Sequence, residues 1–129
     1  MSDIVPPEAG ETTYTVDTLL KYMGNDDKAL AVVGKIVRDA VTPGMEPLER
    51  ARIALDEQRF HDAGRIFHSL RGSVGTLGAK RMVAAALALE QALVEQRGAE
   101  VPALFAALQR EYQAVLDQAG MWLQQHLPG

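Results

Sequence analysis

Apolar residues recur at intervals of three and four positions along most of the chain, the spacing that places them on one face of an α-helix. β-branched residues are scattered and never alternate with polar residues over the length of a strand. Prolines, glycines and capping residues divide this pattern into segments. We predict six helices, over residues 17–23, about 26–42, 47 to about 58, 59–77, 79–97 and 102 to about 123.

Residues with strong positional preferences define several of these boundaries. Asp17 is the predicted N-cap of the first helix, and Asn25 or Asp26 is the predicted N-cap of the second. Side-chain oxygens of Asp and Asn accept hydrogen bonds from the unpaired backbone amides of a helix's first turn. Gly78 and Gly98 are predicted to end the fourth and fifth helices, since glycine adopts the left-handed conformation that often follows a helix.

Short loops between long amphipathic helices make consecutive helices antiparallel neighbours. We therefore predict an all-α fold, an antiparallel up-and-down four-helix bundle made by the last four helices, with the two additional N-terminal helices capping it. Residues 1–14 contain two prolines, a glycine and few apolar residues, a composition typical of a flexible N-terminal tail or linker. The folded domain is predicted to span residues 15–127.

The fourth predicted helix carries a regular apolar stripe. Its members follow spacings of 3, 4, 3, 4 and 3, as in a bundle seam, and are Phe60, Ala63, Phe67, Leu70, Val74 and Leu77. At about 100° per residue, His68 lies roughly 130–140° from the centre of that stripe. We therefore predict that His68 faces solvent.

Three glycines surround His68 on its side of the helix: Gly64 at i−4, Gly72 at i+4 and Gly75 at i+7. Each glycine inside a helix lowers helix stability by about 0.8–1 kcal/mol relative to alanine. Three glycines on one exposed helix face therefore indicate that this face has a function. Their missing side chains clear space for a partner's backbone or a bulky substituent on the imidazole. Arg71, at i+3, would supply a positive charge to an anion on the ring.

His61 lies at i−7 from His68, on the same face and about 10 Å along the helix. Two histidines that far apart do not bind one metal ion, and no third ligand accompanies them, so no metal site is predicted. His61 is interpreted as a rim residue of a docking surface, with an ordinary surface residue as the alternative. A single exposed histidine is by itself most often an ordinary surface residue, so the glycines carry the argument for His68.

Composition narrows the function classes. Of 129 residues, 47% are apolar and 23% charged, a globular balance, and the net charge of −4 argues against a nucleic-acid partner. The absence of cysteine excludes disulfides and thiolate metal sites. The longest apolar run, 82–89, is too short to cross a bilayer, and no signal peptide is visible, so we expect a cytoplasmic protein without membrane contact.

The segment from His68 to Ala79 reads HSLRGSVGTLGA. It resembles the phosphorylation-site motif of bacterial histidine phosphotransfer domains of multistep phosphorelays: His, any, Leu, Lys, Gly, two small, two variable, apolar, Gly, Ala. Leu89, Glu90 and their neighbours resemble the leucine–glutamate helix that follows the site, and the resemblance covers roughly residues 16–127. There are two departures from the motif. Arg71 replaces the usual lysine, and Val74 replaces a small residue.

The resemblance implies that His68 is a phosphoacceptor attacking through Nε2. With that role for His68, the helix positions described above predict that Arg71 lies near the phosphate and that Gly64, Gly72, Gly75 and His61 serve access and docking. The resemblance also implies a relay that accepts the phosphoryl group from a receiver-domain aspartate and passes it to another receiver. The expected partners are response-regulator receiver domains and a hybrid sensor histidine kinase. No intrinsic cofactor is expected, because the receiver would supply Mg²⁺. The domain is expected to be monomeric. It is expected to be either a free-standing cytoplasmic protein or the cytoplasmic C-terminal domain of a membrane-bound hybrid sensor kinase.

Two alternatives share much of this pattern. One is the phosphoacceptor domain of a chemotaxis-type histidine kinase, which would be expected to continue for hundreds of residues. The other is a phosphotransfer-inactive helical docking module, which would be expected to lack the histidine or the glycines. The sequence has no glycine-rich phosphate loop after a strand and no Walker lysine motif, so we expect no ATP-dependent kinase activity of its own. Whether the chain counts as an enzyme stays open.

Overall fold

The computed structural model describes residues 7–126, and these residues contain helices and turns but no strand. The helices are α1 (Pro7–Tyr22), α2 (Asp27–Val41), α3 (Glu46–Asp56), α4 (Phe60–Ser73), α5 (Lys80–Val94) and α6 (Val101–His126), with short 3₁₀ helices η1 (Gly75–Leu77) and η2 (Gly98–Glu100). The predicted all-α class is confirmed. Over the same residues, none of the helices is both long and apolar enough to span a bilayer.

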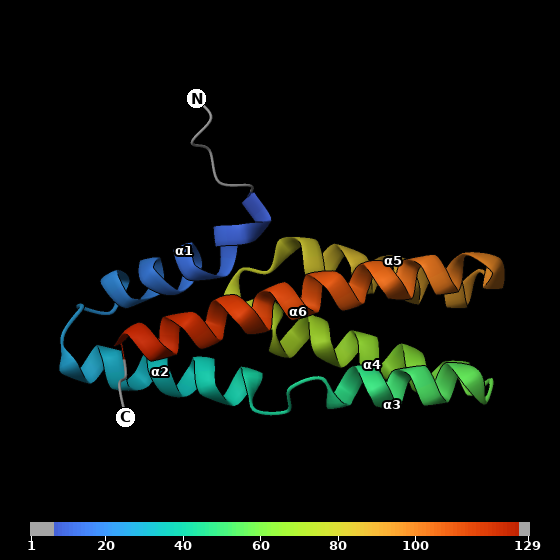
Figure 1. The fold of residues 1–129 in the computed structure, drawn as a ribbon, viewed down its shortest axis with the longest axis horizontal. Helices are drawn as coiled ribbons and strands as arrows, with labels where there is room; N and C mark the ends of the chain where they lie inside the picture. The colour runs from blue at the N-terminus through green and yellow to red at the C-terminus, as the bar shows by residue number, and fades with distance from the viewer. Residues whose placement is uncertain (1–6, 127–129) are drawn as a thin grey trace.

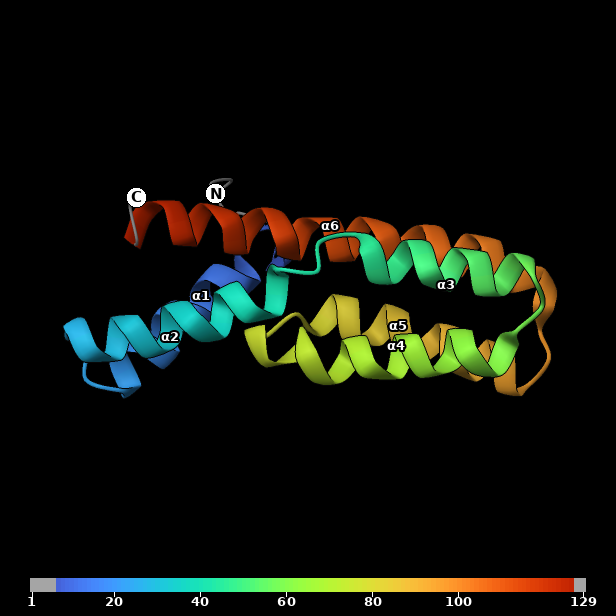
Figure 2. The same ribbon diagram turned by 90° about the horizontal axis from the view of Figure 1, so that it is seen from below.

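The long helix α6 runs the length of the molecule (Figures 1 and 2). Helices α3, α4 and α5 lie along its N-terminal half and complete the four-helix bundle, with extensive packing between α3 and α4, α4 and α5, and α5 and α6. Helices α1 and α2 pack on the C-terminal half of α6. Because α1 also contacts η1, the two N-terminal helices close the end of the bundle at which α4 connects to α5.

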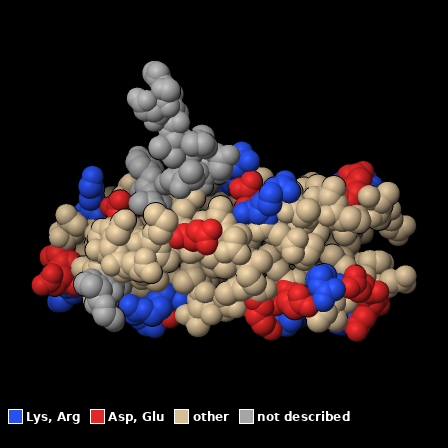
Figure 3. All heavy atoms as spheres, in the orientation of Figure 1, with Lys and Arg blue, Asp and Glu red and all other residues tan. Residues whose placement is uncertain are grey.

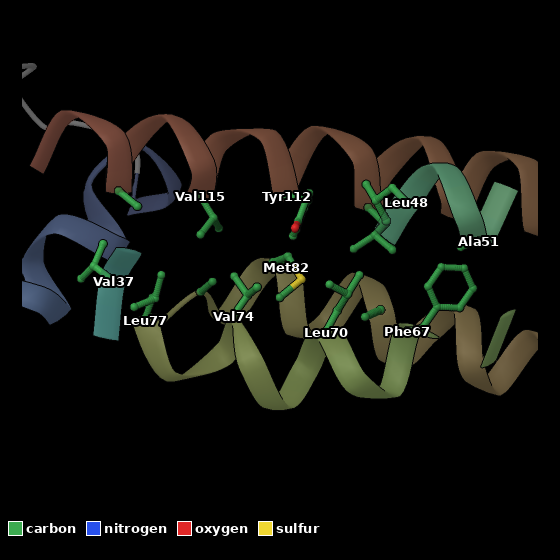
Figure 4. Close-up of a cluster of buried hydrophobic side chains, with 14 of the residues drawn as sticks. Val37, Leu48, Ala51, Phe67, Leu70, Val74, Leu77, Met82, Tyr112 and Val115 are labelled. Carbon is green, nitrogen blue, oxygen red and sulfur yellow. The ribbon is translucent and has the colours of Figure 1, made fainter. Parts of the chain in front are cut away.

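The core lies between α6 and the other bundle helices. Figure 4 shows Leu70 and Val74 of α4 pointing toward α6, and Met82 lies between them and Tyr112. The two largest polar-tipped side chains of α6 are satisfied: the Tyr112 hydroxyl donates to the Gly44 carbonyl at 2.7 Å, and Trp122 Nε1 donates to an Asp17 carboxylate oxygen at 2.7 Å. The buried face of α4 is thereby fixed toward α6, which leaves its opposite face for solvent.

The N-terminal prediction is corrected by the structure. Helix α1 begins at Pro7, ten residues before the predicted start, so residues 7–14 of the expected tail are helical, and residues 1–6 lie outside the described residues. Tertiary packing is the physical reason. The Thr12 amide donates to the buried side-chain oxygen of Gln118 at 2.8 Å, and Val16 and Leu20 are buried in the core.

Three predictions about helix ends and faces are also corrected. Helix α4 ends at Ser73, and a 3₁₀ turn continues to Leu77 before the left-handed Gly78. Helix α5 ends at Val94, and Gln96 adopts the positive φ that we had assigned to Gly98. Phe60, expected in the seam, is 47% exposed, because it begins α4 near the end of the bundle. The predicted cap Asp26 is confirmed, since its carboxylate accepts from the Ala29 amide at 2.8 Å.

Charges of both signs are dispersed over the surface. On the face shown in Figure 3, acidic and basic side chains lie close to one another around the rim, with uncharged residues between them. Several belong to ion pairs within one helix, such as Lys35 with Asp39 at 2.9 Å and Arg50 with Glu46 at 3.0 Å. Exposed pairs of this kind contribute about 0.3–0.5 kcal/mol each, so this fold depends mainly on its apolar core.

Candidate functional site

His68 lies near the middle of α4, on the side opposite the buried stripe. Its side chain is 72% exposed, whereas the preceding Phe67 is completely buried. The prediction that His68 faces solvent is therefore confirmed. Two further side chains approach the ring: Arg71, one turn later on α4, and Glu90 from the neighbouring helix α5.

The contacts converge on one ring nitrogen. Arg71 Nη2 lies 2.9 Å from His68 Nδ1, and a Glu90 carboxylate oxygen lies 3.5 Å from the same nitrogen. Arg71 also binds Glu90 through two hydrogen bonds, from Nε at 2.5 Å and from Nη2 at 3.1 Å. Among residues 7–126 no polar contact to Nε2 of His68 is seen, so Nε2 is the nitrogen turned toward open space.

The Arg71–Glu90 pair is largely covered by the helices that carry it. The side chains are 26% and 17% exposed, and the hydrogen bonds to Glu90 raise the pKa of Arg71 above its usual value. A guanidinium held by two parallel hydrogen bonds to a carboxylate is a strong and geometrically specific contact. The sequence predicts Arg71 as a positive charge beside the ring for an anion on it, and the structure adds a carboxylate partner, Glu90, that the sequence did not indicate.

The three glycines differ in their surroundings. A Cβ on Gly72 would meet nothing within 4 Å, and one on Gly64 would only reach Leu93 at 4.0 Å. Both positions therefore agree with the interpretation that they keep space open. Gly75 does not, because it lies in η1 and a Cβ there would come within 3.1 Å of Val83 on α5. The close approach of η1 to α5 leaves little room for a side chain at that position.

A shallow groove between α4 and α5 runs beside His68. Its lining includes His61, Gly64 and Glu90, so the structure brings His61 and His68 to the same groove. Arg71, Gly72 and Gly75 lie outside its lining. Apolar side chains form the far margin of the groove, where Val94 is 81% exposed and Phe60 is 47% exposed. Exposed apolar side chains gathered beside a polar site mark a candidate protein-docking surface.

Glu90 is the site residue that sequence reasoning missed. We noted it as part of the leucine–glutamate pattern, without a contact to His68. The signal was present in its position directly after the fully buried Leu89, which places Glu90 at the edge of the packed face of α5. Only the register of α5 against α4 puts its carboxylate beside the histidine, 22 residues earlier in the chain. Nowhere in residues 7–126 do three His, Cys, Asp or Glu side chains gather as a metal site.

Comparisons with known proteins complete the description. The family model for the Hpt domain matches residues 35–118, more than half of the chain. The matched segment runs from within α2 to within α6 and includes His68, Arg71 and Glu90. Searches of curated proteins and of solved structures gave no match. The chain belongs to the Hpt domain family, and its function is histidine phosphotransfer in two-component signalling.

Proposed function

We propose that this protein is a phosphorelay intermediate whose His68 accepts a phosphoryl group from the aspartate of one receiver domain and passes it to a second receiver. One observation carries the assignment of the histidine. His68 is 72% exposed, and its Nδ1 is covered by Arg71 and Glu90, so Nε2 is left as the atom that an incoming group can reach.

The transfer step needs a lone pair on Nε2. That lone pair forms the bond to phosphorus while the bond from phosphorus to the partner's aspartate oxygen breaks, and the electron pair of the broken bond stays on that carboxylate. Attack requires the tautomer with the proton on Nδ1, and once the bond to phosphorus has formed that ring is positively charged. Glu90, 3.5 Å from Nδ1, is placed to accept that proton in a hydrogen bond and to balance the charge. Positioning and charge compensation are what a loose phosphoryl transition state requires.

The receiver would dock over the His68 face and bring its Mg²⁺ and acidic residues with it. The open surroundings of Gly64 and Gly72 let another backbone approach the ring closely. Val94 and Phe60, exposed at the margin of the groove, supply apolar area that a partner would bury. Burial of exposed apolar side chains is a favourable term in most protein–protein association.

The test uses the purified protein and a phosphorylated receiver domain. We expect the protein to acquire acid-labile phosphate from the receiver only when Mg²⁺ is present, and none from Mg-ATP alone. His68→Gln should abolish labelling with an almost unchanged free energy of unfolding, because the side chain is exposed. His61→Gln is the matched control for the attachment site, since His61 is the other histidine of the groove: it should still acquire acid-labile label, at a lower rate if His61 contacts the receiver.

A second receiver then tests the relay. Label on the purified phosphoprotein should move to it, with loss from His68. Retention of acid-labile label in His68→Gln would refute the site. Labelling by a kinase catalytic domain, with no exchange with any receiver tested, would favour the phosphoacceptor domain of a chemotaxis-type kinase and refute the relay.

A further inference from the structure

The contact between Arg71 and His68 determines which ring nitrogen carries the proton. Every guanidinium nitrogen of arginine is a donor, and none can accept a hydrogen bond. Arg71 Nη2 lies 2.9 Å from His68 Nδ1, so Nδ1 must accept with its lone pair. A neutral ring in this arrangement therefore carries its proton on Nε2.

That tautomer is the unreactive one for attack through Nε2, because the in-plane lone pair of Nε2 is replaced by an N–H bond. Glu90 requires the opposite tautomer, since a carboxylate only accepts and can engage Nδ1 only when Nδ1 is protonated. The two neighbours thus compete for one nitrogen. In the structure the arginine is nearer, at 2.9 Å against 3.5 Å for the Glu90 oxygen.

We propose that Arg71 holds His68 in a resting tautomer with the proton on Nε2, and that an incoming phosphoryl group releases it by drawing the guanidinium away from Nδ1. Nε2 then gives its proton to solvent water and keeps the lone pair, while Nδ1 takes a proton from water and donates it in a hydrogen bond to Glu90, so the ring stays neutral before attack. Arg71 is a positioning residue in this scheme. The proposal rests on the proposed function, and it assigns to Arg71 a second task besides facing the phosphate.

The geometry of arginine makes both contacts possible at once. Nε and one Nη2 hydrogen form the pair with Glu90, and the second Nη2 hydrogen reaches His68. The side chain is 26% exposed and therefore accessible to a group arriving over the ring. Phosphoryl oxygens are charged acceptors and bind a guanidinium more strongly than a neutral imidazole does. The lysine usual at this position has a single nitrogen and cannot reproduce the fork.

The experiment reads the tautomer directly, by ¹⁵N chemical shifts of the His68 ring in the isolated, labelled protein at a pH where the ring is neutral. In the wild-type protein we expect Nδ1 to be the unprotonated nitrogen. Arg71→Met removes the donor and should move the ratio of tautomers toward Nδ1–H by about tenfold, equivalent to ~1.4 kcal/mol. Arg71→Lys keeps a positive charge beside Glu90 and should move the tautomer ratio in the same direction. It replaces the methionine variant if that variant does not fold.

Two matched variants separate this effect from a general change at the surface. Arg65 lies three residues before His68 on the same helix, as Arg71 lies three after it, and it makes no hydrogen bond to the ring, so Arg65→Met should leave the tautomer ratio unchanged. Glu90→Gln removes the competing carboxylate and should not increase Nδ1–H. A wild-type ring already protonated on Nδ1, or an unchanged ratio in the folded Arg71 variants, would overturn the proposal. Because no receiver takes part, that result is independent of whether His68 proves to be the phosphoacceptor.

Discussion

Replacing Gly72 with alanine tests whether that glycine serves access or packing. Gly72 lies in the last turn of α4, is exposed, and has no φ requirement that excludes alanine. A Cβ there would meet nothing within 4 Å. Helix propensity is then the main term, and we expect Gly72→Ala to raise the free energy of unfolding by about 0.5–1 kcal/mol. For a domain of this size that is a rise in Tm of roughly 2–4 °C.

Gly75→Ala is the contrasting variant. Its Cβ would come within 3.1 Å of Val83 Cγ2, closer than ordinary van der Waals contact, so the Val83 side chain must give way by a few tenths of an ångström. We expect no stabilisation and a loss of up to about 2 kcal/mol, in the range of mild overpacking. Urea unfolding followed by circular dichroism measures both variants on the same scale.

The same position links stability to function. Gly72→Gln places a long side chain beside the ring and should slow transfer from a phosphorylated receiver well below the rate of Gly72→Ala, without lowering stability below that of the wild type. A loss of more than ~0.5 kcal/mol in Gly72→Ala would mean that the glycine is needed for packing. An equal gain in Gly72→Ala and Gly75→Ala would refute the distinction between the two glycines.

Three further predictions concern the rest of the molecule. Gly78→Ala should lose about 2–4 kcal/mol in urea unfolding, because φ there is +76° and a Cβ would lie 2.0 Å from Thr15 Oγ1. Burial raises the pKa of Tyr112 above 10.0, so the folded state holds its proton longer than the unfolded state. Stability should therefore fall as the pH rises above about 10, less steeply in Tyr112→Phe, in unfolding measured across that range. Val94→Ser should weaken receiver binding by roughly fivefold in calorimetry, about 1 kcal/mol of buried apolar surface, while Met121→Ser, also exposed but on distant α6, should not.

The predictable parts of the fold were those that local chemistry decides. Apolar spacing gave the buried face of α4, and the side-chain oxygen of Asp26 gave the start of α2. The start of α1 could not be found in the same way. Its first turns have a weak local signal, and one of their contacts is the hydrogen bond from Thr12 to Gln118, which joins positions 106 residues apart. Local pattern carries no information about such a partner.

The functional site shows the same difference between features that local sequence predicts and features that depend on tertiary packing. The exposure of His68 and the clear space at Gly72 follow from angles around a single helix. Glu90 and the packing role of Gly75 depend on how α5 lies against α4 and η1, which is a tertiary property. The paired state of Arg71 was missed for the same reason, because its partner comes from another helix.

The charges around His68 explain why Glu90 and Arg71 belong together. A carboxylate beside Nδ1 favours the reactive tautomer, but it also repels an anionic phosphoryl group arriving at Nε2. Two unit charges roughly 7 Å apart interact by about 0.6 kcal/mol in water and ~2.4 kcal/mol near a protein surface, a range that spans a roughly threefold to sixtyfold effect on encounter. Before transfer, Arg71 is bound to Glu90 at 2.5 Å, and its positive charge cancels most of that repulsion. When the guanidinium of Arg71 binds the phosphoryl group, its positive charge compensates that anion. The Glu90 carboxylate then lies beside the positively charged ring. The pair therefore keeps the site close to neutral at each stage, and replacing either member should harm transfer more than its exposure alone indicates.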